Sequence, residues 1–199
     1  MTIKDTQPKE KKSTKKTSVK EKSVLKDLGA RMEQRSRMKN LLRKDIEVEI
    51  MNNTNGKLFY KCPKTHQIIE MQGYGDMEVL TIEQLNAMKN SHRNMLENFW
   101  IVIVDVYDDE VEIDDVLAYL RLDKLYKGIK FDSEILDGLV RETDLEEFKA
   151  IILDIQPSLV VRIAERMKVL SEAGSFGDMY KMRFISELMG QPDLFTEDR

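Results

Sequence analysis

The chain has 199 residues, of which 41% are hydrophobic and 34% are charged, with a single cysteine. This length and composition suit one domain of ordinary size with a solvated extension, and they exclude an internal disulfide framework. The longest apolar run, residues 99–104, is about a third of the roughly 20 residues that a membrane-spanning helix needs, and the first residues lack the apolar stretch of a secretory signal. We therefore expect a soluble protein, made in the cytoplasm, with no membrane partner.

The formal net charge of −4 conceals two segments of opposite charge. Residues 1–44 contain 15 Lys and Arg against 5 Asp and Glu, a net charge of +10, whereas residues 45–199 carry a net charge of −14. This pattern is typical of an acidic body with a basic extension, and we call residues 1–44 the basic arm.

The basic arm divides into two parts. Residues 1–22 hold almost no large apolar side chains, so burial cannot offset the entropy of ordering them, and we expect them to be disordered. From Ser23 onward, apolar residues recur on one helical face, which predicts a basic amphipathic helix to about Lys44. The apolar residues of this face are Leu25, Leu28, Met32, Met38 and Leu42.

Strand alternation begins directly after the basic arm. Ile46, Val48 and Ile50 alternate with two glutamates, which predicts a strand with one buried face.

Turn chemistry follows this strand. The run Asn-Asn-Thr-Asn-Gly at 52–56 tolerates positive φ and predicts a reversal into a second strand at 58–60. Further turns at Pro63 and at 73–76 flank a strand at 67–71. We expect a three- or four-stranded antiparallel meander.

A helix and an apolar strand close this region. Thr81 and Gln84 fit a capping box, so a helix should start there and run to about Asn98. Its sheet-facing residues should be Ile82, Leu85, Met88 and Leu96. Residues 99–104, Phe-Trp-Ile-Val-Ile-Val, predict a buried central strand.

Helical periodicity dominates the rest of the chain. Thr143 and Glu146 fit a second capping box, Pro157 suits a helix start, and Gly174 and Gly190 suit helix ends. Apolar residues at helical spacing predict four or five short helices. They are Ile113, Val116, Leu117, Leu120 and Leu125; Ile135, Leu136, Leu139 and Val140; Leu145, Phe148, Ile152 and Ile155; Leu159, Ile163, Met167 and Leu170; and Met179, Met182, Ile185 and Leu188.

These elements predict an α+β fold. A small antiparallel β-meander with a packed helix at 45–106 is followed by a bundle of short helices at 107–199, and residues 1–44 precede both as the basic arm, first disordered and then helical.

Two segments contain residue types that bind metals. Cys62 and His66 have a plausible spacing, but a structural zinc site needs four ligands, so we favour a hairpin turn. Asp105 ends an apolar strand and precedes a run of acidic residues to Asp115, which is compatible with a magnesium-dependent nuclease. Acidic residues also favour helix N-termini, and we prefer that interpretation. We expect no metal, cofactor or catalytic residue.

Two further fragments suggest catalysis only weakly. Ser91 and His92 are neighbours on the expected helix, so their side chains should diverge and no nucleophile is assembled. Gly73 and Gly75 lack the third glycine of a phosphate-binding loop, and a tight turn is the better interpretation.

The basic arm holds most of the functional content. Its cations can neutralise the phosphates of nucleic acid, contact an acidic protein surface, including the acidic body of another copy, or only solubilise the chain. A membrane-surface helix ranks lower because the apolar face of residues 23–44 is interrupted. The candidate contact residues are Lys11, Lys12, Lys15, Lys16, Lys20, Lys22, Arg31, Arg35, Arg37 and Arg43.

Part of the chain resembles small virion proteins of tailed bacteriophages. The resemblance covers about a third of the chain and rests on the fragments VEIMNNTNG at 48–56, LFY at 58–60, GYGD at 73–76, LNAMKN at 85–90 and NFW at 98–100. It implies a non-enzymatic structural protein that works in many copies, located in the virion.

We therefore expect an oligomeric assembly protein of a phage head, neck or tail. Its partners would be other virion proteins or copies of itself, with packaged nucleic acid as a further partner of the basic arm. Phe59, Tyr60 and Tyr74 are candidates for either core or contact surface. The alternative is a nucleic-acid-binding regulator that uses the arm for phosphate contacts, although the acidic helical half argues against groove binding.

Overall fold

The structure is a computed structural model that describes residues 28–33, 44–127, 129–132 and 134–195. The chain divides into two units, Met1–Leu41 and Leu42–Arg199. In the first unit, residues 28–33 form a helix whose side chains are largely exposed, including Leu28 and Met32. This confirms part of the helix expected at 23–44, although Lys44 itself lies in a turn; the expected disorder at 1–22 lies outside the described residues.

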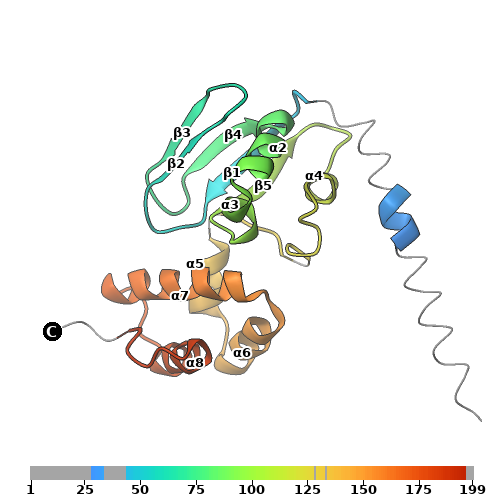
Figure 1. Ribbon diagram of the computed structural model, residues 1–199. Coiled ribbons are helices and arrows are strands. Elements are labelled where there is room, and N and C mark those ends of the chain that lie inside the picture. The colour runs from blue at the N-terminus through green and yellow to red at the C-terminus, as the bar shows by residue number, and fades with distance from the viewer. Residues whose placement is uncertain (1–27, 34–43, 128, 133, 196–199) are drawn as a thin grey trace, which may run out of the picture. The chain divides into compact units, whose positions relative to one another are not determined.

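The second unit has the expected α+β fold (Figure 1). Its larger sheet has three antiparallel strands, with β1 (Glu47–Asn52) between β4 (Met77–Thr81) and β5 (Ile101–Tyr107). A separate two-stranded antiparallel sheet pairs β2 (Leu58–Lys61) with β3 (Ile68–Met71). The antiparallel strands are confirmed, but their order differs from a meander.

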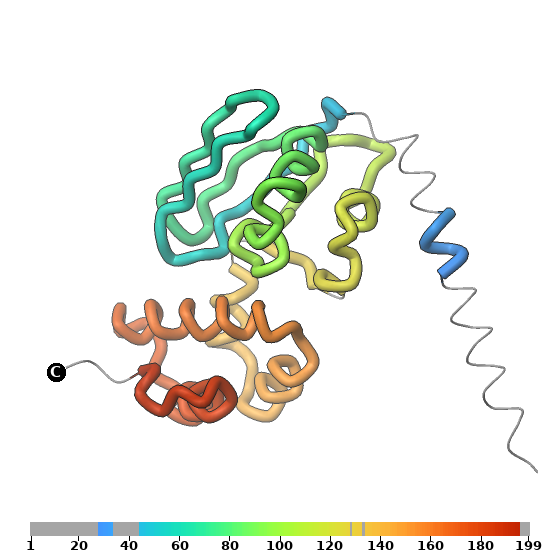
Figure 2. The backbone as a smooth tube through the Cα atoms, in the orientation of Figure 1, coloured from blue at the N-terminus to red at the C-terminus, as the bar shows by residue number. Residues whose placement is uncertain are grey.

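The strand order follows from which strand can be buried on both sides. Figure 2 lets the reader trace β1 between its two neighbours. Val48 and Ile50 have no exposed surface, and Val48 lies opposite Leu80 of β4. Since β1 is the best buried of the three, it takes the centre, and residues 53–57 lead away to the β2–β3 hairpin instead of pairing β2 with β1.

The apolar run at 99–104 is an edge strand, not the central strand that we expected. Phe99 has a left-handed backbone (φ 54) and β5 starts two residues later. The run is apolar because α3 and α4 contact β5 and its first three residues are fully buried. Its second half alternates toward solvent, after a bulge opposite Glu49 and Ile50.

The helix after β4 starts as predicted. The Thr81 hydroxyl accepts a hydrogen bond from the Gln84 N–H, and the Gln84 amide oxygen accepts one from the Thr81 N–H, which confirms the capping box. The helix is shorter than expected, because α2 (Ile82–Ser91) ends at His92 (φ −138) and a separate α3 (Arg93–Glu97) follows. The four side chains that we expected to face the sheet are buried: Ile82, Leu85, Met88 and Leu96.

Helix α4 (Ile113–Leu120) covers the region after β5. It ends where Arg121 adopts a left-handed backbone (φ 60), so Leu125 lies outside the helix in which we had placed it.

Four further helices complete the expected C-terminal group: α5 (Ile135–Glu142), α6 (Leu145–Asp154), α7 (Pro157–Glu172) and α8 (Met179–Met189). Pro157 occupies the first turn of α7, as predicted, and Gly174 and Gly190 have positive φ at the ends of α7 and α8. The capping box at Thr143 is wrong. Asp144 caps α6 through the Glu147 N–H, while the Thr143 hydroxyl donates to the Leu139 carbonyl.

Within the described residues, no helix is long and apolar enough to cross a membrane.

Candidate functional site

The exposed ends of β1 and β5 gather three carboxylates and a phenol on one face of the sheet. Glu49 lies opposite Asp105, and Glu47 lies opposite Tyr107. Facing residues of paired strands project to the same side, which here is opposite to the buried Val48. We call Glu47, Glu49, Asp105 and Tyr107 the acidic face.

The four side chains of the acidic face are coupled electrostatically. The Tyr107 hydroxyl donates a hydrogen bond of 2.8 Å to Oε1 of Glu49. That bond, together with the negative charges of Glu49, Asp105 and Glu47, raises the pKa of Tyr107 above its ordinary value. In the part of the chain that the structure describes, no lysine, arginine or histidine forms an ion pair with these three carboxylates.

Negative charge continues along the chain beyond β5. Asp109, Glu110 and Glu112 are exposed, and Asp114 is exposed in the first turn of α4. This end of the sheet is therefore a strongly acidic surface that follows the basic arm directly in sequence.

Most of the predicted contact residues lie outside the described residues. These are Lys11, Lys12, Lys15, Lys16, Lys20, Lys22, Arg35, Arg37 and Arg43. Arg31 is described, on the helix at 28–33, and it is half-buried. Their role as the site of partner binding stays a prediction.

The three aromatic candidates for core or contact surface differ in their burial. Tyr60 belongs to the core, Phe59 is 60% exposed on the outer side of the β2–β3 hairpin, and Tyr74 is half-buried. The Arg166 guanidinium lies 4.1 Å from the centre of the Tyr74 ring and forms two hydrogen bonds with Asp137. Of the three, only Phe59 offers a large exposed ring to a partner.

The acidic run from Asp105 to Asp115 ends in the residues that cap helix α4. Glu112 and Asp115 form a capping box at the start of α4. Asp105, Glu112 and Asp114 also line a cavity of about 390 Å³. Among the described residues, however, no three Asp, Glu, His or Cys side chains are grouped closely enough to hold a metal ion. The geometry of this run favours the helix-capping interpretation.

Cys62 and His66 belong to the turn of the β2–β3 hairpin, as we favoured. The His66 N–H donates to the Cys62 carbonyl, and His66 has a left-handed backbone (φ 59). Burial tends to raise the pKa of the Cys62 thiol, but the nearby polar groups of Thr65 and the Lys64 backbone outweigh this effect, so its pKa is lowered. The thiol has no exposed surface, which keeps it from external reactants.

The expectation that the side chains of Ser91 and His92 diverge is wrong. Nδ1 of His92 lies 2.8 Å from Oγ of Ser91, because α2 ends at Ser91 and His92 leaves the helical conformation. The Ser91 hydroxyl donates its proton to the Ala87 carbonyl at 2.8 Å, so it accepts from the imidazole. A nucleophilic serine requires the opposite arrangement, in which the histidine accepts the proton.

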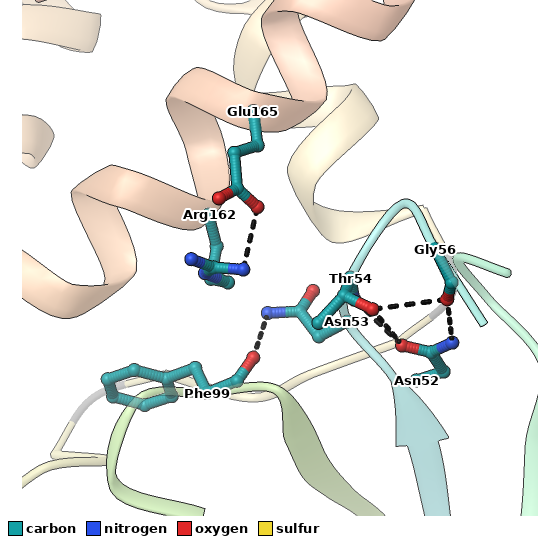
Figure 3. Close-up of polar contacts among 7 residues, drawn as sticks. All are labelled: Asn52, Asn53, Thr54, Gly56, Phe99, Arg162 and Glu165. Atoms are coloured by element: carbon teal, nitrogen blue, oxygen red, sulfur yellow. Dashed lines mark hydrogen bonds and ion pairs between the residues drawn. The ribbon is translucent and has the colours of Figure 1, made fainter. Parts of the chain in front are cut away.

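The 52–56 turn is hydrogen-bonded to the segment that follows α3, and Arg162 of α7 lies near Asn53 of this turn (Figure 3); we call this region the polar seam. The Asn53 amide donates to the Phe99 carbonyl at 3.0 Å, and its main-chain N–H donates to the Trp100 carbonyl at 2.9 Å. These two bonds hold the left-handed turn at Phe99. Oδ1 of Asn53 and Nε of Arg162 are both buried without a hydrogen bond partner in the described protein.

Neither this seam nor a second buried polar group, Lys181, was predicted from the sequence. Lys181 is 2% exposed, and its Nζ donates to the carbonyls of Val140 (2.8 Å) and Thr143 (2.5 Å). Lysines are almost never fully buried unless paired, so a lysine in a helical pattern is normally assigned to the surface. Lys181 satisfies the carbonyl groups at the end of α5.

Comparison with known proteins adds no identity: no family model, curated protein or solved structure matches this chain.

Proposed function

We propose that this chain is a non-catalytic structural protein of a phage particle, and that its copies assemble by contact between the basic arm of one copy and the acidic face of the next. The observation that carries the proposal is the acidic face itself. Glu47, Glu49 and Asp105 project together from an exposed part of the sheet, and none of them forms an ion pair with a described lysine, arginine or histidine.

Charge complementarity indicates that the acidic face binds the basic arm. The arm has a net charge of +10, and the body that follows it has a net charge of −14. Because the arm and the face are different surfaces, the contact is heterologous, and repetition of such a contact builds rings or filaments. The resemblance to small virion proteins likewise implies a protein that works in many copies.

Exposed ion pairs are individually weak, so several must act together. One exposed pair contributes about 0.2–1 kcal/mol, and salt at about 0.15 M screens charges beyond roughly 8 Å. The proposed assembly is therefore sensitive to salt, and crowding of many copies in a particle would favour it.

Two variants of the full-length chain test the contact by complementation. One is the face variant E47Q/E49Q/D105N, which keeps the shape of the three side chains and removes their charges. The other is the arm variant K11E/K12E/K15E/K16E. We expect each variant alone to stay monomeric and an equimolar mixture to form heterodimers, because the arm of the first can bind the intact face of the second.

The control is a variant with three exposed carboxylates neutralised elsewhere, E142Q/E147Q/E172Q. It should assemble like the wild type. If the face variant also assembles like the wild type, the acidic face is not the receptor. If the wild type stays monomeric at low salt but binds DNA through the arm, the chain is instead a nucleic-acid-binding protein, which is the alternative that the charge of the arm supports.

A further inference from the structure

A second cavity adjoins the one that Asp105 borders, and both are lined by Ile129, Lys130 and Phe131. This second cavity has a volume of about 690 Å³ and is lined by residues 124, 125, 127 and 129–131 and by helices α5, α6 and α7. Small-molecule sites commonly have volumes of about 300–1,000 Å³ and are lined mainly by apolar side chains. The size of this cavity is therefore that of a ligand site.

The wall of the cavity is apolar but incompletely covered. Five aliphatic side chains pack against the core and yet remain only half-buried: Leu125, Ile129, Ile135, Leu139 and Ile155. Phe131 and Leu159 close the wall with fully buried side chains. An apolar occupant would remove the remaining aliphatic surface from water, which is the main source of favourable free energy for such binding.

The charged groups around the cavity are mostly positive. Lys124, Lys127 and Lys130 line it and are exposed, and none of them forms an ion pair with a described residue. The carboxylate in the lining is Asp154. The three lysines stand out in a body with a net charge of −14.

This charge also excludes the chain's own basic arm as the occupant. The amphipathic part of the arm has an apolar face, but its surrounding Lys and Arg would be brought against three further lysines. A ligand with a negatively charged group and an apolar body is complementary to both the three lysines and the aliphatic wall.

We propose that this cavity binds a small amphiphile with an anionic head group and an apolar body. The lysines at 124, 127 and 130 neutralise the head group, and the aliphatic wall holds the body. The proposal does not depend on the assembly function, and Lys130 also lines the neighbouring cavity that Asp105 borders.

Three amphiphiles with the same C12 chain test the proposal on the full-length protein, each used below its critical micelle concentration. They are dodecanoate, dodecyltrimethylammonium and dodecyl maltoside, with anionic, cationic and neutral head groups. We expect calorimetry to show one saturable site for dodecanoate, with at least about tenfold weaker binding of the other two. Methyl NMR should show shifts at Ile135, Ile151 and Ile155 and none at the remote Ile50.

Two variants assign the roles of head group and chain. K124Q/K127Q/K130Q should weaken dodecanoate binding about tenfold and leave dodecyl maltoside unchanged, whereas the control K57Q/K61Q/K64Q, also exposed, should leave both unchanged. L139W should fill the cavity and abolish binding, while L153W, on the exposed side of α6, should not.

The proposal is overturned if dodecanoate does not bind, if all three amphiphiles bind equally, or if the methyl shifts lie outside the cavity. Unchanged binding to the triple lysine variant also overturns it, and this variant alters only exposed side chains, so it should fold even if L139W does not.

Discussion

The hydroxyl of Tyr107 lies 2.8 Å from a carboxylate oxygen of Glu49, across two paired strands of the sheet. The bond fixes the direction of the Glu49 side chain, and the neighbouring carboxylates of Glu47 and Asp105 project from the same face. Negative charge thus accumulates on this face, and none of the three carboxylates forms an ion pair with a described lysine, arginine or histidine.

The first prediction concerns the ionisation of Tyr107. Its pKa is raised because it donates to Glu49 and faces the charges of the acidic face. In the face variant E47Q/E49Q/D105N, the charges that oppose ionisation are absent, so the pKa of Tyr107 should fall toward the ordinary tyrosine value. NMR titration of tyrosine labelled at Cζ measures this shift. An unchanged Tyr107 titration would mean that the carboxylates do not act on the phenol.

The second prediction concerns stability at alkaline pH. Burial, followed by the charge of Asp137, raises the pKa of Tyr74 from 10.0 to about 12. Between these values the unfolded chain loses a proton that the folded chain retains, so the free energy of unfolding falls as the pH rises from 10 to 12. In Tyr74→Phe this contribution is absent, and the decrease should be less steep.

Urea unfolding of the wild type and of Tyr74→Phe at pH 8, 10 and 11.5 measures how the free energy of unfolding changes with pH. The Tyr74 hydroxyl is buried without a hydrogen bond partner in the described protein, so Tyr74→Phe should cost little stability at pH 8. A variant that loses stability with pH as steeply as the wild type would contradict the assignment. Tyr180→Phe, at a phenol that is 74% exposed, is the matched control for the effect of removing a hydroxyl.

The third prediction concerns the buried lysine. Lys181→Met should lower the free energy of unfolding by about 2 kcal/mol, because the carbonyls of Val140 and Thr143 lose their donor and stay buried. Lys149→Met removes only a surface pair with Glu146 and should change stability by less than about 0.5 kcal/mol. Chemical unfolding of the two variants compares them directly, and equal effects would show that the buried ammonium is not required.

The fourth prediction concerns the polar seam. Asn53→Ala removes the side-chain bond to the Phe99 carbonyl and should cost about 1–3 kcal/mol of stability. Asn90→Ala, at an exposed site near the end of α2, should be close to neutral. Hydrogen exchange of the amides at 99–102 should also accelerate in Asn53→Ala. Unaltered exchange there would contradict the role of Asn53 in holding this turn.

Local signals in the sequence predicted local structure well. The alternation at Val48 and Ile50 and the box formed by Thr81 and Gln84 each depend on residues within a few positions, and the structure confirms them. Thr143 shows where such signals fail, because Thr143 and Asp144 both suit a cap. In the folded chain the Thr143 hydroxyl donates to the Leu139 carbonyl, and Asp144 caps α6 instead.

Non-local features were harder to predict. The pairing of β1 with β5 joins residues 49 to 60 positions apart, and alternation does not reveal which strands become neighbours. The acidic face arises only from this pairing, since Glu49 and Asp105 are distant in sequence. The negative charge of the body was evident from composition, but its concentration on one face of the sheet was not.

The most direct test of the assembly proposal is the molar mass in solution, measured by light scattering at low and high salt, with and without DNA. The full-length chain is compared with a variant that lacks residues 1–41 and so retains the whole second unit, Leu42–Arg199. We predict that the full-length chain forms an oligomer at low salt without DNA, that high salt dissociates it, and that the truncated chain is monomeric throughout. A full-length chain that is monomeric at low salt and gains mass only with DNA would contradict the proposal.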